Sequence, residues 1–265
     1  MNGFDRRGRW GEYNEAEARE FPWIDLCLRQ IDRYSADSSY EILAWDNSFI
    51  PEQRRLMRAH PKVRMFGQRQ PGAHIGHGPA LDRLLLKVRP GTEYVITMDT
   101  DSFPIRSGWI ENLTGRLSSG AMLAGVWRSE IQKDKPAYVH PSGLAVRRDT
   151  LLRLGSNFAI GDGVDVGTNV TAAAEAVGGR LSRLLRTNHW NPHYLMGAVY
   201  GDLIYHQGAG SRNPRFTGGG QSADHEAVRE ALRNAAFSDI DGLIDALTGN
   251  ADPGTVEGVR QSANP

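Results

Sequence analysis

Two aspartates one residue apart, Asp99 and Asp101, follow an apolar segment in the first half of the sequence. The segment, residues 94–98, is Tyr-Val-Ile-Thr-Met and has the composition of a buried β-strand. In open α/β sheets, ligands bind outside the carboxyl ends of the strands. Two carboxylates placed there suit a hard divalent cation, whose shell is completed by water and substrate phosphates. The alternative is an aspartate turn before Pro104.

Three more polar clusters follow predicted strands or lie in adjoining loops. They are Asp46-Asn47-Ser48, Asp162-Gly163-Val164-Asp165, and His206 with the glycine-rich residues after it. One such cluster is ordinary. Four of them in an alternating pattern of strands and helices indicate a single crevice at one edge of a sheet.

The spacing of apolar residues predicts an α/β fold. Strands are expected over residues 40–45, 63–66, 93–98, 121–127, 140–147, 181–185 and 204–205, and helices over 22–34, 52–59, 79–88, 109–117, 149–154, 168–177, 224–237 and 240–247. Strands that alternate with helices favour a doubly wound, mostly parallel sheet flanked by helices. We expect one domain over residues 1–215, and a short C-terminal helical extension and tail over 216–265.

The composition excludes several classes of partner. The chain has 31 Lys plus Arg and 31 Asp plus Glu, so no net field attracts nucleic acid or anionic lipid. The single cysteine, Cys27, excludes an internal disulfide and a cysteine-rich zinc site. No apolar stretch approaches the roughly 18 residues of a membrane span, and the N-terminus has no signal-peptide core. The sequence therefore predicts a cytoplasmic protein with no integral membrane segment.

The motifs taken in order resemble those of family 2 glycosyltransferases with the GT-A fold. The matching segments, which together cover about residues 22–212, are LCLRQI with WDNS, GHGPALDRLL, VITMDTDSF with its DxD motif, SGLAVRRDTLLRLG, GDGVDV and YHQGAGSR. Each short motif is weak alone, but their order along the chain makes the resemblance specific. It implies an enzyme that transfers a hexosyl or deoxyhexosyl group from a nucleoside diphosphate sugar to a glycan, lipid-linked or small-molecule acceptor.

The resemblance also implies roles for individual residues. Asp101 would be a direct ligand of Mn²⁺ or Mg²⁺, and Asp99 would contact ribose or a metal-bound water. His206 would complete the metal shell or contact the diphosphate. Asp46 would hydrogen-bond the base, and Asp82 would stand near the diphosphate-side helix, where the family often has Asn.

An inverting transfer needs a general base for the acceptor hydroxyl. Where the family has Glu-Asp, this chain has Asp162-Gly163, so the usual base position holds glycine. Either Asp162 or Asp165 is expected to serve instead; a helix N-cap is the structural alternative for Asp165. A second departure is that nothing before Trp23 resembles the family's first strand. We expect that this strand is missing from the given sequence or is replaced by residues 4–20.

Two other functions remain open at this point. A non-catalytic protein that binds sugar nucleotides on the same fold would account for both departures. A haloacid-dehalogenase-like phosphatase would use Asp99 as nucleophile and Asp101 as acid/base, with Asp162 near its metal. Against the phosphatase, the DxD motif lies far from the start of the chain.

Overall fold

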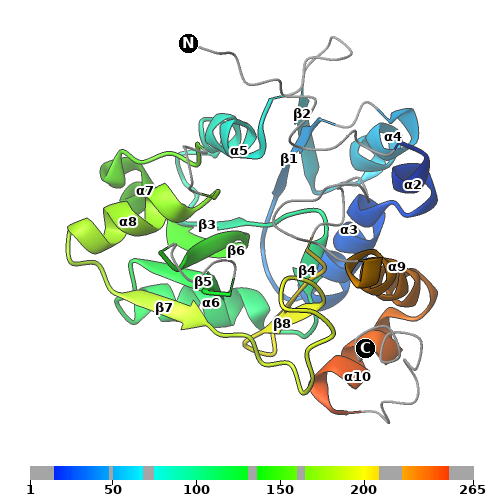
Figure 1. Cartoon of the computed structure of the whole chain (residues 1–265). Coiled ribbons are helices and arrows are strands. Elements are labelled where there is room, and N and C mark those ends of the chain that lie inside the picture. Colours follow the sequence, from blue (N-terminus) through cyan, green and yellow to red (C-terminus); the bar gives the residue numbers. More distant parts are fainter. Residues whose placement is uncertain are drawn as a thin grey trace, which may run out of the picture.

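The structure is a computed structural model that describes residues 15–47, 50–67, 75–130, 136–159, 165–208 and 223–250. It has an α/β fold in which helices flank the sheets (Figure 1). The strands are β1 (Ile42–Asp46), β2 (Val63–Gly67), β3 (Tyr94–Thr97), β4 (Ser102–Pro104), β5 (Leu123–Arg128), β6 (Tyr138–Arg147), β7 (Leu181–Leu184), β8 (Ala198–Tyr200) and β9 (Ile204–His206). The helices are α2 (Glu15–Glu20), α3 (Trp23–Tyr34), α4 (Pro51–Ala59), α5 (His77–Leu85), α6 (Trp109–Ser118), α7 (Arg148–Leu154), α8 (Thr168–Ala176), α9 (Ala223–Ser238) and α10 (Ile240–Thr248).

The four-stranded sheet has the order β3-β6-β5-β7. Strand β6 runs antiparallel to both β3 and β5, and β5 runs parallel to β7. Three of the four strands therefore point the same way, and β1 and β2 form a separate parallel pair among the described residues. The predicted α/β class, with helices that flank the sheet, is confirmed. The sheet itself is mixed, because both pairings of β6 are antiparallel.

Strand β5 is buried on both faces, so its apolar residues divide between two layers of helices. Ala124 and Val126 pack in a cluster with Leu113 of α6. Leu123 points the opposite way and packs with Val170 of α8. This alternation follows from the two-residue period of a strand, and it places the sheet in the middle of three layers.

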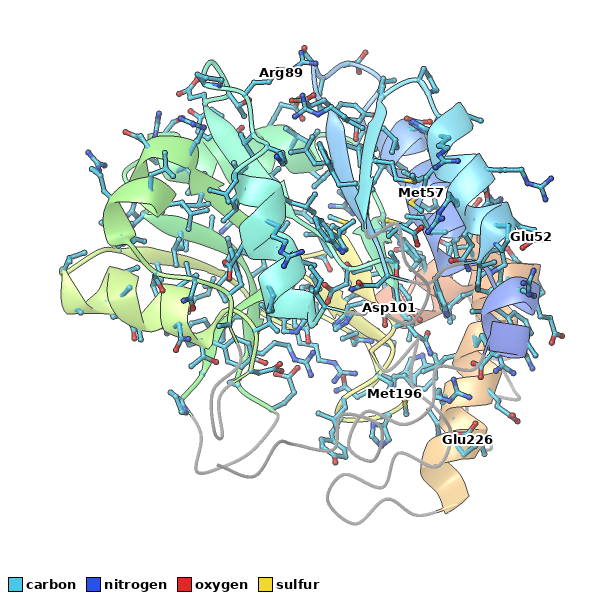
Figure 2. All side chains as sticks on the ribbon, turned by 90° about the horizontal axis from the view of Figure 1, so that it is seen from above. Glu52, Met57, Arg89, Asp101, Met196 and Glu226 are labelled. Carbon is cyan, nitrogen blue, oxygen red and sulfur yellow. The ribbon has the colours of Figure 1, made fainter. Side chains whose placement is uncertain are left out.

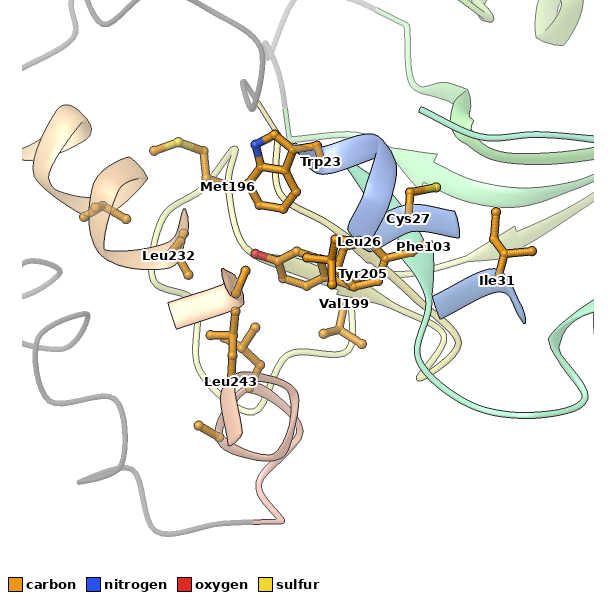
Figure 3. Packing of buried hydrophobic residues seen from close by; sticks show 14 residues of the cluster. Trp23, Leu26, Cys27, Ile31, Phe103, Met196, Val199, Tyr205, Leu232 and Leu243 are labelled. Carbon is orange, nitrogen blue, oxygen red and sulfur yellow. The ribbon is translucent and has the colours of Figure 1, made fainter. Parts of the chain in front are cut away.

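The third sheet, β4-β9-β8, is antiparallel and packs against a different core. Phe103 and Tyr205 of this sheet pack with Trp23 and Leu26 of α3 (Figure 3). The same cluster includes Leu232 and other residues of the two C-terminal helices: Val228, Ala236, Leu243, Ala246 and Leu247. Helices α9 and α10 thus form one wall of the core behind β4 and β9.

The predicted helices and strands are present to within a few residues at each end. Three short elements were not predicted: α2, β4 and β8. Residues 1–14 lie outside the described residues, so the expectation about the missing first strand stays a prediction. In the part of the chain that the structure describes, no helix is long and apolar enough to cross a membrane.

Candidate functional site

The acidic pair lies in a tight turn between β3 and β4. The Ser102 amide donates to the Asp99 carbonyl at 3.1 Å, and the Ser102 hydroxyl donates to the same oxygen at 3.0 Å. The Asp99 amide in turn donates to the Ser102 hydroxyl oxygen at 3.1 Å. The turn therefore fixes Asp99 and Asp101 directly after the carboxyl end of β3, where the sequence predicted them. Figure 2 shows Asp101 near the middle of the molecule, whereas Glu52 and Arg89 project at its edge.

Strand pairing brings His206 to this turn from far along the chain. In the β4–β9 ladder, His206 is the partner of Ser102, the residue after Asp101. The Gln207 amide donates to the Asp101 carbonyl at 2.9 Å, which extends the pairing past the turn. As a result, His206 Nε2 lies 3.8 Å from Asp101 Oδ1. The structure thus brings the motif of Asp101 and the motif of His206 side by side.

Two histidines that the sequence analysis did not select complete the cluster. His77 Nε2, at the start of α5, lies 2.9 Å from Asp99 Oδ1. His140 Nδ1, on β6, lies 3.8 Å from Asp99 Oδ2. One nitrogen or oxygen from each of Asp99, His140 and His206 lies within 4.8 Å of the others. We call Asp99, Asp101, His77, His140 and His206 the histidine–carboxylate cluster.

The electrostatics of the cluster separate charged from neutral members. Burial alone would raise the pKa of Asp99, but the His77 imidazole, which lies against it, holds that pKa well below its usual range. Burial opposes charge on His77 too, yet Asp99 raises the pKa of His77 above its ordinary value. Burial lowers the pKa of both His140 and His206. Burial therefore favours the neutral form of His140 and His206, while the low pKa of Asp99 favours its ionised form.

Hydrogen bonds limit which histidine nitrogens can bind a ligand. The Ser142 amide donates to Nδ1 of His140 at 3.1 Å. An imidazole nitrogen has one lone pair. The contact with Ser142 therefore occupies the lone pair of Nδ1, the nitrogen of His140 that faces Asp99. Asp99 and Asp101 remain the oxygen donors at the turn, and carboxylate oxygens are ligands that Mg²⁺ and Mn²⁺ accept. The donor set therefore fits the divalent cation that the sequence predicted.

Asp165, one of the two candidate bases, is tied to the same region. Its Oδ2 accepts a hydrogen bond from the Tyr138 hydroxyl at 2.6 Å, and its Oδ1 accepts the Val166 amide at 2.8 Å. The Tyr138 ring lies 5.8 Å, centroid to centroid, from that of His140. Asp165 is thus one side chain away from the histidine–carboxylate cluster. Asp162, the other candidate, lies outside the described residues.

Asp46 lies at the carboxyl end of β1 and is buried. Arg54 of α4 binds it, with Nε and a terminal nitrogen each 2.6 Å from Asp46 Oδ2. The next residue, Asn47, exchanges two hydrogen bonds with the backbone of Ile75. Because Ile75 is two residues before His77, this contact links the end of β1 to the histidine–carboxylate cluster.

Asp82, on α5, forms a hydrogen bond within the protein. Its Oδ1 accepts the Phe158 amide at 2.9 Å, and burial raises its pKa. The same helix approaches the same segment at Gly78, where a Cβ atom would lie 1.8 Å from the Phe158 carbonyl oxygen. Asp82 and Gly78 therefore hold the start of α5, and with it His77, against the segment that leads to residues 160–164.

Sequence reasoning missed His77, His140 and Arg128. His140 had one available signal, because it is a polar residue within a strand that is otherwise mostly apolar. His77 lies in the glycine-rich stretch Gly76-His77-Gly78, where nothing marks it as a partner of Asp99. Arg128 ends β5, and only the fold brings it to His206.

No protein-family model and no curated protein matches this chain. Among solved structures, it is similar to a 4-diphosphocytidyl-2C-methyl-D-erythritol synthase from Anaerococcus prevotii, with a TM-score of 0.44 and 11% identity over 62% of this chain and 76% of that one. It is also similar to a mycobacterial protein, with a TM-score of 0.47 and 17% identity over 91% of this chain and 79% of that one.

Proposed function

We propose that this chain is a metal-dependent glycosyltransferase that moves a sugar from a nucleoside diphosphate sugar to an acceptor hydroxyl. The observation that carries the proposal is the convergence of Asp99 and Asp101 with His206 at the end of β3. These residues come from two of the motifs that resemble family 2 glycosyltransferases. The acceptor is a glycan, a lipid-linked sugar or a small molecule.

Each part of the crevice has a role in this proposal. Asp99 and Asp101 hold the cation, which when bound stabilises the negative charge on the leaving diphosphate. Asp46 accepts a hydrogen bond from the base, with Arg54 fixing the orientation of its carboxylate. Asp82 supports the diphosphate side by fastening α5.

The proton of the acceptor hydroxyl goes to Asp162 or Asp165 in the inverting reaction. General-base catalysis contributes about 10²–10⁴-fold, so Asn at the true base lowers turnover by about that factor. Nucleotide affinity in the presence of metal stays unchanged in that variant. If neither substitution lowers turnover, the inverting mechanism is wrong.

Calorimetric titration tests the proposal without knowledge of the sugar. UDP, GDP and dTDP are titrated into the protein in Mn²⁺ and, separately, in EDTA. We expect one of them to bind much more tightly in Mn²⁺, and a hundredfold excess over its Kd to stabilise the fold by about 2.7 kcal/mol. Asp101→Asn removes the metal-dependent part. Asp202→Asn, in the turn between β8 and β9, is the matched control and binds like wild type.

Other results would favour other functions. Equal nucleotide affinity in Mn²⁺ and in EDTA contradicts the metal site. Nucleotide binding without sugar transfer or donor hydrolysis indicates a non-catalytic binding protein. A phosphoenzyme trapped on Asp99 indicates a phosphatase of the haloacid-dehalogenase type.

A further inference from the structure

His206 lies between a guanidinium and a carboxylate. Its Nδ1 is 3.4 Å from a terminal nitrogen of Arg128, and its Nε2 is 3.8 Å from Asp101 Oδ1. Arg128 is itself held in place, because it is 5% exposed and its Nε lies 2.7 Å from Glu130 Oε1. The Tyr200 hydroxyl donates to the same Glu130 oxygen at 2.7 Å. The guanidinium is therefore positioned by Glu130, which Tyr200 holds in turn.

The chemistry of these two groups determines where the imidazole proton sits. A guanidinium has five N–H donors, has no acceptor and does not deprotonate in proteins. The His206 Nδ1 atom that faces Arg128 is therefore an acceptor. A neutral imidazole carries one proton, so that proton is on Nε2, the nitrogen that faces Asp101. Stacking against His140, with ring centroids 5.2 Å apart and planes 31° apart, limits rotation of the ring.

We propose that His206 presents an N–H group, and not a lone pair, to Asp101, and that Arg128 is the positioning residue that sets this tautomer. A histidine that binds metal usually donates its other ring N–H to a carboxylate or a carbonyl. The other nitrogen of His206 instead faces a group that can only donate. The surroundings of His206 therefore do not fit a metal ligand, and the cation is held by the carboxylates.

The proposed tautomer gives His206 a specific role. A neutral N–H next to the acidic pair can donate a hydrogen bond to an oxygen that carries negative charge. If the proposed function is right, this oxygen belongs to the diphosphate, and the bond strengthens as charge develops on the leaving group. The sequence left two roles open for His206, and the contacts of Arg128 favour the diphosphate over the metal.

Nuclear magnetic resonance reads the tautomer directly. In protein labelled with ¹⁵N-histidine, long-range ¹H–¹⁵N correlations show which ring nitrogen is protonated, and the His206→Gln spectrum identifies the His206 signals. We expect the proton on Nε2 at pH 7.5, both without metal and with saturating Mg²⁺. A proton on Nδ1, or loss of the Nε2 proton when Mg²⁺ is added, overturns the proposal.

The role of Arg128 is tested by removing its donors. In Arg128→Met, a second population protonated on Nδ1 should appear, because Nδ1 no longer faces an obligate donor. Arg116→Met is the control, since Arg116 contacts Asn112 and Ser182 elsewhere, and it should leave the His206 signals unchanged. An unchanged tautomer in folded Arg128→Met contradicts the role of Arg128. If Arg128→Met does not fold, the wild-type spectrum and the next measurement decide.

Titration with Mn²⁺ alone, followed by electron paramagnetic resonance, separates ligands from neighbours. We expect His206→Gln to keep Mn²⁺ affinity within about twofold and Asp101→Asn to lower it by about tenfold or more. An equal loss in both variants makes His206 a ligand and overturns the proposal. Absence of Mn²⁺ binding in wild type contradicts the proposed function but not the tautomer, which the spectra establish independently.

Discussion

Replacing Gly78 with alanine should destabilise the protein through a backbone clash. A Cβ atom at this position would lie 1.8 Å from the Phe158 carbonyl oxygen and 2.6 Å from its carbon. Backbone atoms cannot rotate away, so α5 or the segment at Phe158 must shift. Overpacking of this kind costs about 1–3 kcal/mol, and the depth of the overlap places it near the upper value. Alanine regains up to about 1 kcal/mol of helix propensity, which leaves a net loss of about 2 kcal/mol.

Urea unfolding followed by circular dichroism measures this loss. In a chain of this size, about 2 kcal/mol also lowers the melting temperature by about 4–8 °C. Gly115→Ala is the matched control, because Gly115 is also helical and a Cβ there has no atom within 4 Å. It should stabilise the protein by about 0.5–1 kcal/mol. If Gly78→Ala is as stable as wild type while Gly115→Ala is stabilised, α5 does not pack against Phe158 as described.

Three further substitutions test contacts outside the site. Ser35→Ala should cost about 1–3 kcal/mol in urea unfolding, because it leaves the buried Trp109 indole N–H, now 2.8 Å from the serine hydroxyl, without an acceptor. Asp239→Ala should cost about 1 kcal/mol by removing the N-cap of α10. Arg229 lowers the pKa of Glu17 despite burial. Glu17→Gln should therefore be less stable than wild type above about pH 4.3. This difference in stability should disappear as the pH falls further, because wild-type Glu17 then becomes protonated.

The sequence was a good guide to elements with a clear apolar period and a poor one to very short elements. Helix α3 shows Trp23, Leu26, Cys27 and Ile31 on one buried face, and its bounds were predicted almost to the residue. Strands β4 and β8 have three residues each, too few for any period to be read. They hold their conformation through pairing with β9, which is a long-range contact.

The same distinction applies to the site. Asp99 and Asp101 could be found because they adjoin the strand that positions them. Arg128 could not, because its importance lies in His206, a partner 78 residues away. His140 offered only its polarity within a mostly apolar strand, and its partner Asp99 is also far along the chain. A single sequence also gives no sign that Asp46 is bound by Arg54, although the two are eight residues apart.

The position of the C-terminal helices in the core has a consequence for biosynthesis. The wall behind β4 and β9 contains Leu232 and Leu243, and Arg229 forms an ion pair with Glu17, 212 residues earlier. These contacts therefore form only after the ribosome has made the chain through α9 and α10. Until then, the nascent chain leaves the apolar face of α3 without its final cover, a condition that favours aggregation and chaperone binding. We expect ribosome-bound chains stalled before α9 to be much more sensitive to protease than chains released after α10.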